Sequence, residues 1–262
     1  MSYHPSVSYT GTERVIFIPT IYLSPSTQEF NPYTGGGNEE EYMNLVADAM
    51  IPYLNVSGIS YVRNTPDMTA SSSVRASNSG NYDFHLALHS NASGSGNGNV
   101  RGAEFYYYPR SSSGQRAAEI FANNFKLIYP LPDRVKTVPT TTLAEVVRTR
   151  APAVLAEVAY HDNAEDAEWI RNNIDEIAKN MVLSLTDYFD IPFNIPNQNV
   201  TTATVSTMFG SNLNIRQRPD INSAVIGSIP NRSVISVYYN NGEWSLIEYQ
   251  GTVGYANNRY IK

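Results

Sequence analysis

The chain has 262 residues, a formal net charge of -6, charged residues at only 16% and no cysteine. This length allows one large domain, or a domain of about 180 to 200 residues followed by a small one. The missing cysteines exclude a disulfide framework, thiol catalysis and cysteine zinc sites, so any metal would be held by histidines and carboxylates. The acidic balance, without a Lys/Arg run, argues against a nucleic-acid partner.

Membrane attachment is also not expected from the sequence. No apolar stretch approaches the roughly 18 to 20 residues of a membrane span. Residues 1 to 15 lack the charged and apolar regions of a signal peptide. The surface must rely on Asn, Ser, Thr and many of the 19 tyrosines, a composition common outside the cell. We therefore expect a protein that is extracellular or associated with a cell wall, and that is either released from the cell by another route or already processed. We also expect it to be a monomer.

The first half of the chain alternates apolar strands with amphipathic segments. Residues 14 to 24 predict a buried strand, and residues 38 to 54 a helix that opens with a capping box, Asn38 followed by Glu41. A short strand at 61 to 65 and a polar loop at 69 to 80 come next. Two further strands are expected at 82 to 92 and 103 to 109.

The pattern continues with a helix at about 114 to 128, a turn-rich passage through Pro139, a strand within 151 to 163 and a long helix from Glu165. This alternation predicts an α/β fold with an open, mostly parallel sheet and helices on both faces. Ligands of such sheets gather at the carboxyl ends of the strands.

Composition changes near the end of the chain. Residues 190 to 206 have two prolines, many amides and no periodicity, which indicates a linker. From 207 to 262, short β-branched or aromatic runs separated by turn residues predict a small all-β barrel.

Polar side chains follow three of the predicted strands. They are Ser24 to Gln28, His89 with Ser90 and Asn91, and Glu157 with His161. The helix that starts near residue 39 adds Glu39, Glu40 and Glu41. A histidine at a strand end beside carboxylates is well placed to bind metal, because buried imidazole nitrogens need partners.

Each of these residues also has a structural interpretation. His89 alone could be a hydrogen-bonded core histidine, and the three glutamates could simply favour the helix N-terminus. His85 shares a strand face with His89, but four residues separate them by about 13 Å, so we interpret it as structural. His4 is interpreted as a tail residue.

Glu157 is the one ionisable side chain within the apolar strand PAVLAEVAY. Burial should raise its pKa and favour a role as proton acceptor near neutral pH. The alternative is a carboxylate paired with Arg148 or Arg150.

Taken together, residues 14 to 189 resemble the zinc-dependent N-acetylmuramoyl-L-alanine amidases, which are cell-wall hydrolases. That family opens with Asp-Pro-Gly-His-Gly, has a metal-binding Glu at the next helix start, a third ligand in Ser-Ile-His-x-Asn-Ala and a catalytic Glu in Pro-x-x-Leu-x-Glu. Here LALHSNA implies His89 as a Zn2+ ligand, and PAVLAEVAYHDN implies Glu157 as the catalytic glutamate. Alignment on Asn44 selects Glu40 as the helix ligand, with Glu39 and Glu41 as alternatives one residue away.

The opening motif departs from this family, because SPSTQ stands for Asp-Pro-Gly-His-Gly and places Thr27 where the family has histidine. Two substitutes for that ligand are open. Gln28 could offer its amide oxygen, a weaker ligand for zinc than imidazole, or His161 could approach from the loop after Glu157. A third outcome is weak metal binding and lost activity.

Residues 207 to 262 resemble bacterial SH3-like domains, on the motifs LNIRQRP, AVIG, GEWSLIEY and GTVGYANNRYI. The resemblance implies a wall-binding module, with Tyr238, Tyr239, Trp244 and Tyr255 as contacts for wall peptides or cross-bridges. For Trp244, a place in the barrel core is an equal alternative.

The resemblances imply a catalytic domain at 1 to 189, a linker at 190 to 206 and a wall-binding domain at 207 to 262. The implied reaction is zinc-assisted hydrolysis of the amide between N-acetylmuramic acid and the L-alanine of the stem peptide, with Glu157 as general base and Asn91 contacting substrate. The alternatives are a degenerate amidase that binds peptidoglycan without cutting it, and a zinc peptidase acting within the stem peptide.

Overall fold

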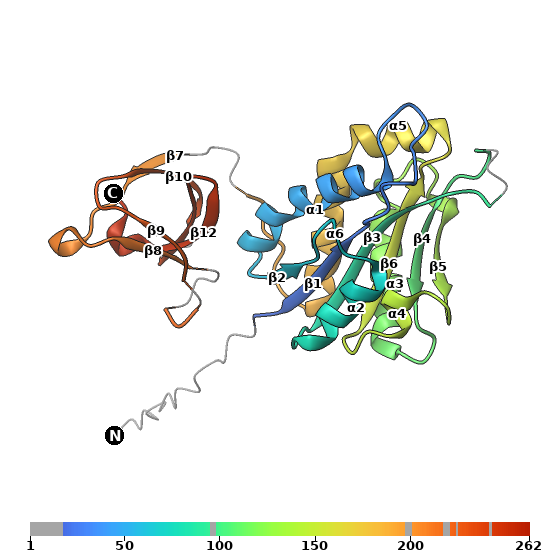
Figure 1. The fold of residues 1–262 in the computed structure, drawn as a ribbon, viewed down its shortest axis with the longest axis horizontal. Helices are drawn as coiled ribbons and strands as arrows, with labels where there is room; N and C mark the ends of the chain where they lie inside the picture. Colours follow the sequence, from blue (N-terminus) through green and yellow to red (C-terminus); the bar gives the residue numbers. More distant parts are fainter. Residues whose placement is uncertain (1–17, 95–97, 197–200, 217–220, 224, 241–242) are drawn as a thin grey trace, which may run out of the picture.

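A computed structural model describes residues 18–94, 98–196, 201–216, 221–223, 225–240 and 243–262 (Figure 1). His4 lies outside this range. The described chain forms an α/β unit followed by an all-β unit, each built on a six-stranded sheet.

The first sheet has the strand order β2-β1-β3-β6-β4-β5. All neighbouring pairs are parallel except β4 and β6, which run antiparallel. The predicted fold, a mostly parallel sheet with helices on both faces, is thereby confirmed. The strands are β1 (Thr20–Pro25), β2 (Ser60–Arg63), β3 (Phe84–Asn91), β4 (Ala103–Tyr107), β5 (Val135–Pro139) and β6 (Ala153–Tyr160).

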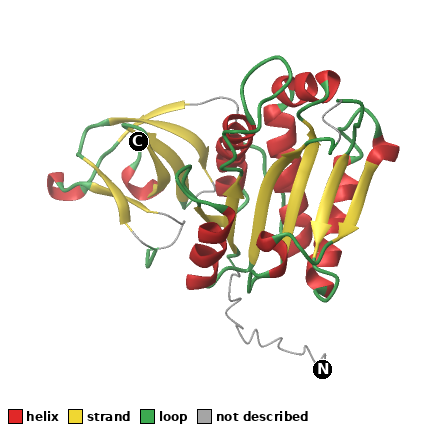
Figure 2. Ribbon diagram, turned by 45° about the vertical axis from the view of Figure 1, so that its right-hand side comes forward, coloured by secondary structure: helices red, strands yellow, loops and turns green. Residues whose placement is uncertain are grey.

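Helices cover the two faces of this sheet unequally (Figures 1 and 2). The long helices α1, α3 and α6 pack on one face and share its apolar core with α5, while the short helices α2 and α4 cover the other. The helices are α1 (Glu39–Val56), α2 (Ala70–Ser79), α3 (Ser112–Phe125), α4 (Ala144–Val147), α5 (Ala164–Asn172) and α6 (Ile174–Phe189).

Alternation along the strands separates a core face from a polar face, because successive side chains of a strand point to opposite sides. On β3, Phe84, Leu86 and Leu88 belong to the main core beneath the long helices. His85 and His89 fall on the opposite face, toward α4, which is where the site is built.

Several predicted elements differ in the structure. The expected polar loop at 69 to 80 is helix α2, which opens with a capping box formed by Thr69 and Ser72. The turn-rich passage contains β5 and α4, and the expected long helix from Glu165 is divided at Asn173 into α5 and α6. The capping of α1 by Asn38, whose side chain accepts from the backbone N–H of Glu41, agrees with the prediction.

The second sheet has the order β7-β10-β11-β12-β8-β9, and its neighbouring strands run antiparallel, as expected for a small β barrel. Strand β7 lies inside the predicted linker of 190 to 206 and pairs with β10, so the connection is shorter than expected. The strands are β7 (Thr201–Thr204), β8 (Leu213–Arg216), β9 (Val225–Ile229), β10 (Val234–Asn240), β11 (Trp244–Tyr249) and β12 (Thr252–Asn257). Single 3-10 turns lie at Pro132–Arg134, Met208–Gly210 and Asn258–Tyr260.

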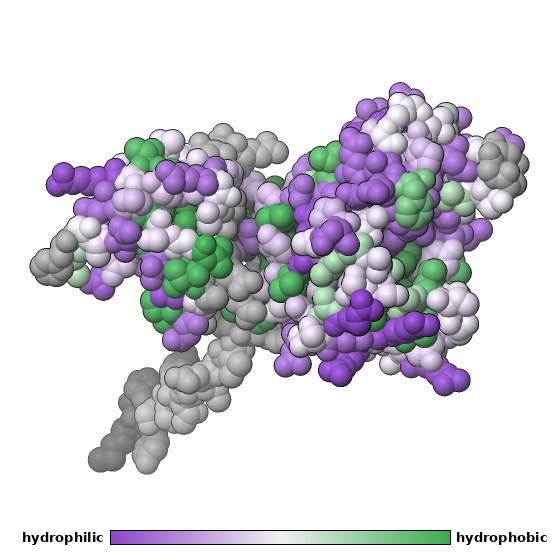
Figure 3. Space-filling model, in the orientation of Figure 1, coloured by the Kyte–Doolittle hydropathy of each residue, from purple (hydrophilic) through white to green (hydrophobic). Residues whose placement is uncertain are grey.

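The barrel contacts the α/β unit at the C-terminal end of α1. Val56 forms one apolar cluster with Trp244, Leu246 and Tyr255. The face seen in Figure 3 is mostly hydrophilic or neutral, with separate apolar patches on both the barrel and the α/β unit. Among the helices that the structure describes, none has the combined length and apolar character of a membrane span.

Candidate active site

Three acidic or basic side chains lie side by side at one end of the first sheet. His89 on β3 is in register with Glu157 on β6, and Glu157 is in register with Glu104 on β4. Residues in register on neighbouring strands point to the same face and lie about 5 Å apart. The strand pairing alone therefore brings a histidine and two carboxylates together.

His89 is held from the loop after β1 and from the start of α1. Its Nδ1 lies 2.8 Å from Glu39 Oε1 and 3.3 Å from Gln28 Nε2. The amide of Asn31 links the two neighbours, donating to Gln28 Oε1 at 3.2 Å and to Glu39 Oε2 at 2.6 Å. Gln28, which follows a different predicted strand and is distant from His89 in sequence, thus lies directly against His89.

The helix glutamate beside His89 is Glu39, not Glu40. Glu39 is the first residue of α1 and is only 1% exposed. Asn44, on which the alignment with Glu40 was based, instead donates to the backbone carbonyl oxygens of Glu40 and Ser26. The sequence alignment selects Glu40, with Glu39 as an alternative one residue away. Three successive glutamates give no sequence signal for which of them turns inward.

Opposing effects set the charge of His89 and Glu39. Burial lowers the pKa of His89, but the hydrogen bonds that its ring donates to Glu145 and Glu39 raise it well above its usual value of 6.5. Burial raises the pKa of Glu39, but the hydrogen bond and charge of His89 bring it below its usual value. The metal-free pair is therefore an imidazolium against a carboxylate.

Glu157 has the opposite electrostatics. Burial raises its pKa to about 7; the charge of His89 lowers it, whereas Glu39 and Glu104 raise it. Part of the residue reaches the surface, but its Oε2 atom is buried and has no hydrogen-bond partner in the described structure. The ion pairs of the described residues do not join Glu157 to Arg148 or Arg150, the alternative partners considered from the sequence.

Glu145 is a buried member of the site that the sequence did not indicate. It lies on the four-residue helix α4 and is 4% exposed. Its Oε2 lies 3.3 Å from His89 Nε2, and its Oε1 lies 3.4 Å from His85 Nε2 and accepts from Ser24 Oγ at 2.5 Å. Burial raises the pKa of Glu145, but His85 and His89 together lower it to about 2. A lone acid in TTLAEVVR offers no pattern that would single it out.

His161 is engaged elsewhere. Its Nδ1 lies 2.8 Å from the backbone oxygen of Ser90, and its ring stacks on Tyr33 with 5.3 Å between the centroids. The hydroxyl of Tyr33 in turn donates to Ser90 Oγ at 2.7 Å. The structure therefore favours Gln28 over His161 as the side chain next to His89.

Asn91 lies at the end of β3, beyond His89. Its amide donates to Glu104 Oε2 at 3.2 Å, and the hydroxyl of Tyr106 donates to the same oxygen at 2.5 Å. Asn91 thus belongs to the polar row that borders Glu157.

A cavity of about 340 Å³ opens beside His89. The loop after β1 supplies one wall, with Phe30 standing 73% exposed at its rim, and the start of α2 supplies another. Its lining residues include Thr27, Gln28, Phe30, Asn64, Met68, Thr69, His89 and Glu145.

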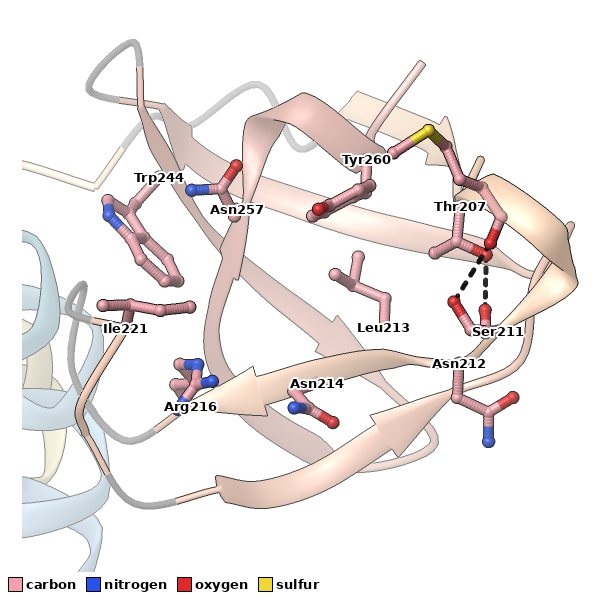
Figure 4. Close-up of a pocket in the computed structure, with 11 residues that line it drawn as sticks. Thr207, Ser211, Asn212, Leu213, Asn214, Arg216, Ile221, Trp244, Asn257 and Tyr260 are labelled. Carbon is pink, nitrogen blue, oxygen red and sulfur yellow. Dashed lines mark hydrogen bonds between the residues drawn. The ribbon is translucent and has the colours of Figure 1, made fainter.

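The barrel has a pocket of its own, of about 370 Å³. Figure 4 shows Trp244 facing Ile221 at one end, with Arg216 below them, and Thr207 beside Ser211 at the other end. Trp244 is 6% exposed and belongs to an apolar cluster as well as to the pocket lining, so it is part of the barrel core, and its contact with the wall stays a prediction.

Neither Tyr238 nor Tyr255, two of the tyrosines predicted to contact the wall, is among the residues that line this pocket. Tyr255 is 4% exposed and packs in the cluster with Val56, because the α/β unit covers that side of the barrel. Tyr238 is partly buried and donates to Glu248 Oε2 at 3.0 Å. The side chain of Tyr239 lies outside the described part of the structure.

Comparison with known families decides the classification. The family model for N-acetylmuramoyl-L-alanine amidase matches residues 27–187, and that for the bacterial SH3 domain matches residues 211–262. The first match covers more than half of the chain. The chain belongs to the N-acetylmuramoyl-L-alanine amidase family. The resemblance noted from LALHSNA and PAVLAEVAYHDN is thereby confirmed, as is the SH3-like segment.

Solved structures similar to this amidase share its fold at low sequence identity. An N-acetylmuramoyl-L-alanine amidase of Nostoc punctiforme aligns with a TM-score of 0.59 and 18% identity, over 66% of this chain and 98% of that one. The catalytic domain of CwlV from Bacillus (Paenibacillus) polymyxa gives 0.57 and 18%, over 66% and 99%. The catalytic domain of the CD27L endolysin, described as targeting Clostridia difficile, gives 0.54 and 20%, over 64% and 97%. The search of curated proteins found no match.

Among the described residues, three neighbouring side chains of the amidase could hold a metal ion, namely Gln28, Glu39 and His89. Two zinc ligands about 2.0 to 2.1 Å from a tetrahedral ion lie about 3.3 to 3.4 Å apart. The distances from His89 Nδ1 to Glu39 Oε1, 2.8 Å, and to the Gln28 amide, 3.3 Å, come near this spacing. A half turn of the Gln28 amide would present its oxygen in place of its nitrogen, and would give up the hydrogen bond that Gln28 Oε1 accepts from Asn31.

The donor set is nevertheless weaker than that of an ordinary catalytic zinc site, which has three ligands drawn from His, Glu, Asp and Cys. Within the described ranges, no cluster of three such residues could hold a metal. The residues present fit a divalent ion bound by two strong donors and one neutral amide.

Proposed function

We propose that this protein is a peptidoglycan hydrolase that cleaves the amide bond between N-acetylmuramic acid and the L-alanine of the stem peptide, with Glu157 as its general base. The observation that carries this proposal is the placement of Glu157 in register with His89, with one carboxylate oxygen buried and unpartnered. Membership of the amidase family supplies the reaction class.

Glu157 is suited to proton transfer at neutral pH. A general base works best when its pKa lies near the working pH, and burial brings the pKa of Glu157 to about 7. Oε2 is free to accept a proton from the attacking water and to return it to the leaving amine of L-alanine. Asn91 and Glu104, which border Glu157, would hold the polar atoms of the stem peptide or sugar.

Gln28, Glu39 and His89 would hold Zn2+ in this proposal. A bound zinc ion polarises the scissile carbonyl and lowers the pKa of water toward 7. His89 is kept in place by contacts at both ring nitrogens, so it needs little rearrangement to present Nδ1. The amide of Gln28 is neutral, and we therefore expect weaker zinc binding than with an imidazole at that position.

The barrel would attach the enzyme to its substrate. Its pocket combines the indole of Trp244 and the exposed side chain of Ile221 with Arg216 and several amides, a mixture suited to an extended wall peptide. This role places the working protein at the cell wall, outside the membrane.

Digestion of purified peptidoglycan by the zinc-loaded protein tests the proposed bond. Mass spectrometry should find free stem peptides that begin with L-alanine and glycan strands left uncut. Fragments of the stem peptide still attached to muramic acid would instead identify a peptidase.

A second function, binding of peptidoglycan without cleavage, is favoured by one observation. Thr27 stands where the related motif has histidine, which leaves the described residues without three His, Asp or Glu ligands. This function predicts sedimentation with peptidoglycan but no released peptide at any zinc concentration.

A further inference from the structure

We propose that Glu145 is a positioning residue that orients the His89 ring, so that Nε2 carries a hydrogen and Nδ1 faces Glu39 and Gln28. His85 and Ser24 hold Glu145 in place, which makes His85, Glu145 and His89 one buried chain. This inference rests on the proposed function only in naming the metal ion as what Nδ1 receives; the orientation itself is a separate claim.

The geometry of Glu145 divides its two oxygens between two tasks. Oε2 faces His89 Nε2 at 3.3 Å. Oε1 accepts from Ser24 Oγ at 2.5 Å and lies 3.4 Å from His85 Nε2. Because Oε1 of Glu145 is held by Ser24 on β1 and lies beside His85 on β3, Oε2 has little freedom to turn away from His89.

His85 is itself held at its other side. Its Nδ1 lies 3.0 Å from Ser77 Oγ on α2, and its ring stacks on Tyr22 with 5.4 Å between centroids. The side chains of His85 and Glu145 are 0% and 5% exposed. A buried carboxylate is costly unless it is paired and hydrogen-bonded; here the hydrogen-bond partners are Ser24 Oγ and His89 Nε2, and His85 Nε2 lies 3.4 Å away without a hydrogen bond of its own among the described residues. The sequence supplies His85 four residues before His89 on the same strand face, so one carboxylate can reach both rings.

The orientation has a chemical consequence at His89. The two ring nitrogens of a histidine are distinct, and the group that hydrogen-bonds one of them decides which is left for a metal. When an ion displaces the proton from Nδ1, an acceptor at Nε2 keeps the remaining hydrogen there, and the lone pair lies at Nδ1, where Glu39 and Gln28 converge. A carboxylate at the outer nitrogen also makes the imidazole a more basic ligand. This gain in ligand basicity matters more here than in a site with three strong donors, because Gln28 is a weak one.

Glu145→Gln tests this positioning role in the full-length protein. The substitution keeps the shape of the side chain but replaces the carboxylate with an amide that can place an N–H against Nε2. Zn2+ affinity, measured by competition with a chromophoric chelator, should fall by about 10- to 100-fold, the usual cost of losing such an outer partner. Glu168→Gln, which removes an exposed carboxylate from α5, is the control and should leave zinc affinity unchanged.

Histidine side-chain 15N NMR of the unmodified protein gives a second readout that needs neither activity nor a stable variant. With Zn2+ bound, we expect His89 to carry its hydrogen at Nε2 and the metal at Nδ1. Zinc bound at Nε2, or an unchanged zinc affinity in a folded Glu145→Gln protein, would overturn the inference.

The same spectra separate this inference from the proposed function. If the protein binds no zinc but the Nε2 hydrogen of His89 is protected from exchange and loses that protection in Glu145→Gln, the metal site fails while the positioning role stands. If the Nε2 position carries no hydrogen in either form, the positioning role fails whatever the enzyme cleaves.

Discussion

Replacing Glu157 with glutamine should stabilise the metal-free protein at neutral and alkaline pH while leaving it little changed in acid. Burial raises the pKa of Glu157 from 4.5 to about 7 in the folded protein. A carboxyl group with a raised pKa binds its proton more tightly in the folded state than in the unfolded state. Its contribution to stability is therefore complete below pH 4.5 and is lost as the pH rises to 7.

The size of this loss follows from the shift. Each pKa unit corresponds to about 1.4 kcal/mol, so a shift from 4.5 to about 7 amounts to about 3.5 kcal/mol. Glutamine resembles the protonated carboxyl group and does not titrate. The difference in unfolding free energy between Glu157→Gln and the unmodified protein should thus grow by about 3.5 kcal/mol between pH 4.5 and 7 and then stay level.

Urea denaturation at a series of pH values, with a chelator present, measures this difference. Glu168→Gln removes the same charge from the exposed face of α5 and controls for the change in net charge. A difference between Glu157→Gln and the unmodified protein that is constant across the pH range would refute the assignment of Glu157 as a buried, unpaired carboxylate.

Three further predictions concern the metal site, the barrel and the core. Gln28→His should raise zinc affinity, because an imidazole is a stronger donor than an amide, whereas His161→Ala should leave it unchanged; metal titration of both variants checks this, and a loss of zinc in His161→Ala would reverse the ligand assignment. Ile221→Ser should weaken sedimentation with peptidoglycan, since Ile221 is 64% exposed in the barrel pocket, while Val234→Ser, 62% exposed outside the pocket lining, should not. Asp166→Asn should lower the unfolding free energy by about 3 to 5 kcal/mol, because Asp166 is fully buried and pairs with Arg101. A loss below 1 kcal/mol in urea denaturation would show that this ion pair does not stabilise the fold.

Much of the fold was predictable because strands and helices carry strong local patterns. The buried strands around Leu86 and Leu155 are mostly apolar, and α1 opens with a recognisable cap at Asn38. Helix α2 was missed because its sequence is rich in serine, and Val74 is the one large apolar residue among those that it buries. The break at Asn173 was missed because the apolar spacing continues across it.

The site was predictable where one residue type stands out from its surroundings. His89 and Glu157 interrupt apolar strands, and the structure places them in register. The choice between Glu39 and Glu40 depends on where a helix begins to within one residue, which sequence patterns do not resolve. Glu145 could not be predicted, because its role comes from tertiary contacts between a short helix and strands that are distant in sequence.

The central claim is that Glu157 serves as the general base for hydrolysis of the muramic acid amide. The most direct measurement is the release of new N-terminal L-alanine from purified peptidoglycan at pH 7, comparing the zinc-loaded protein with zinc-loaded Glu157→Gln. We predict steady release by the unmodified protein, and no release by Glu157→Gln with its zinc content unchanged. Equal release by both proteins would contradict the assigned base, and no release by either would identify a peptidoglycan-binding protein instead.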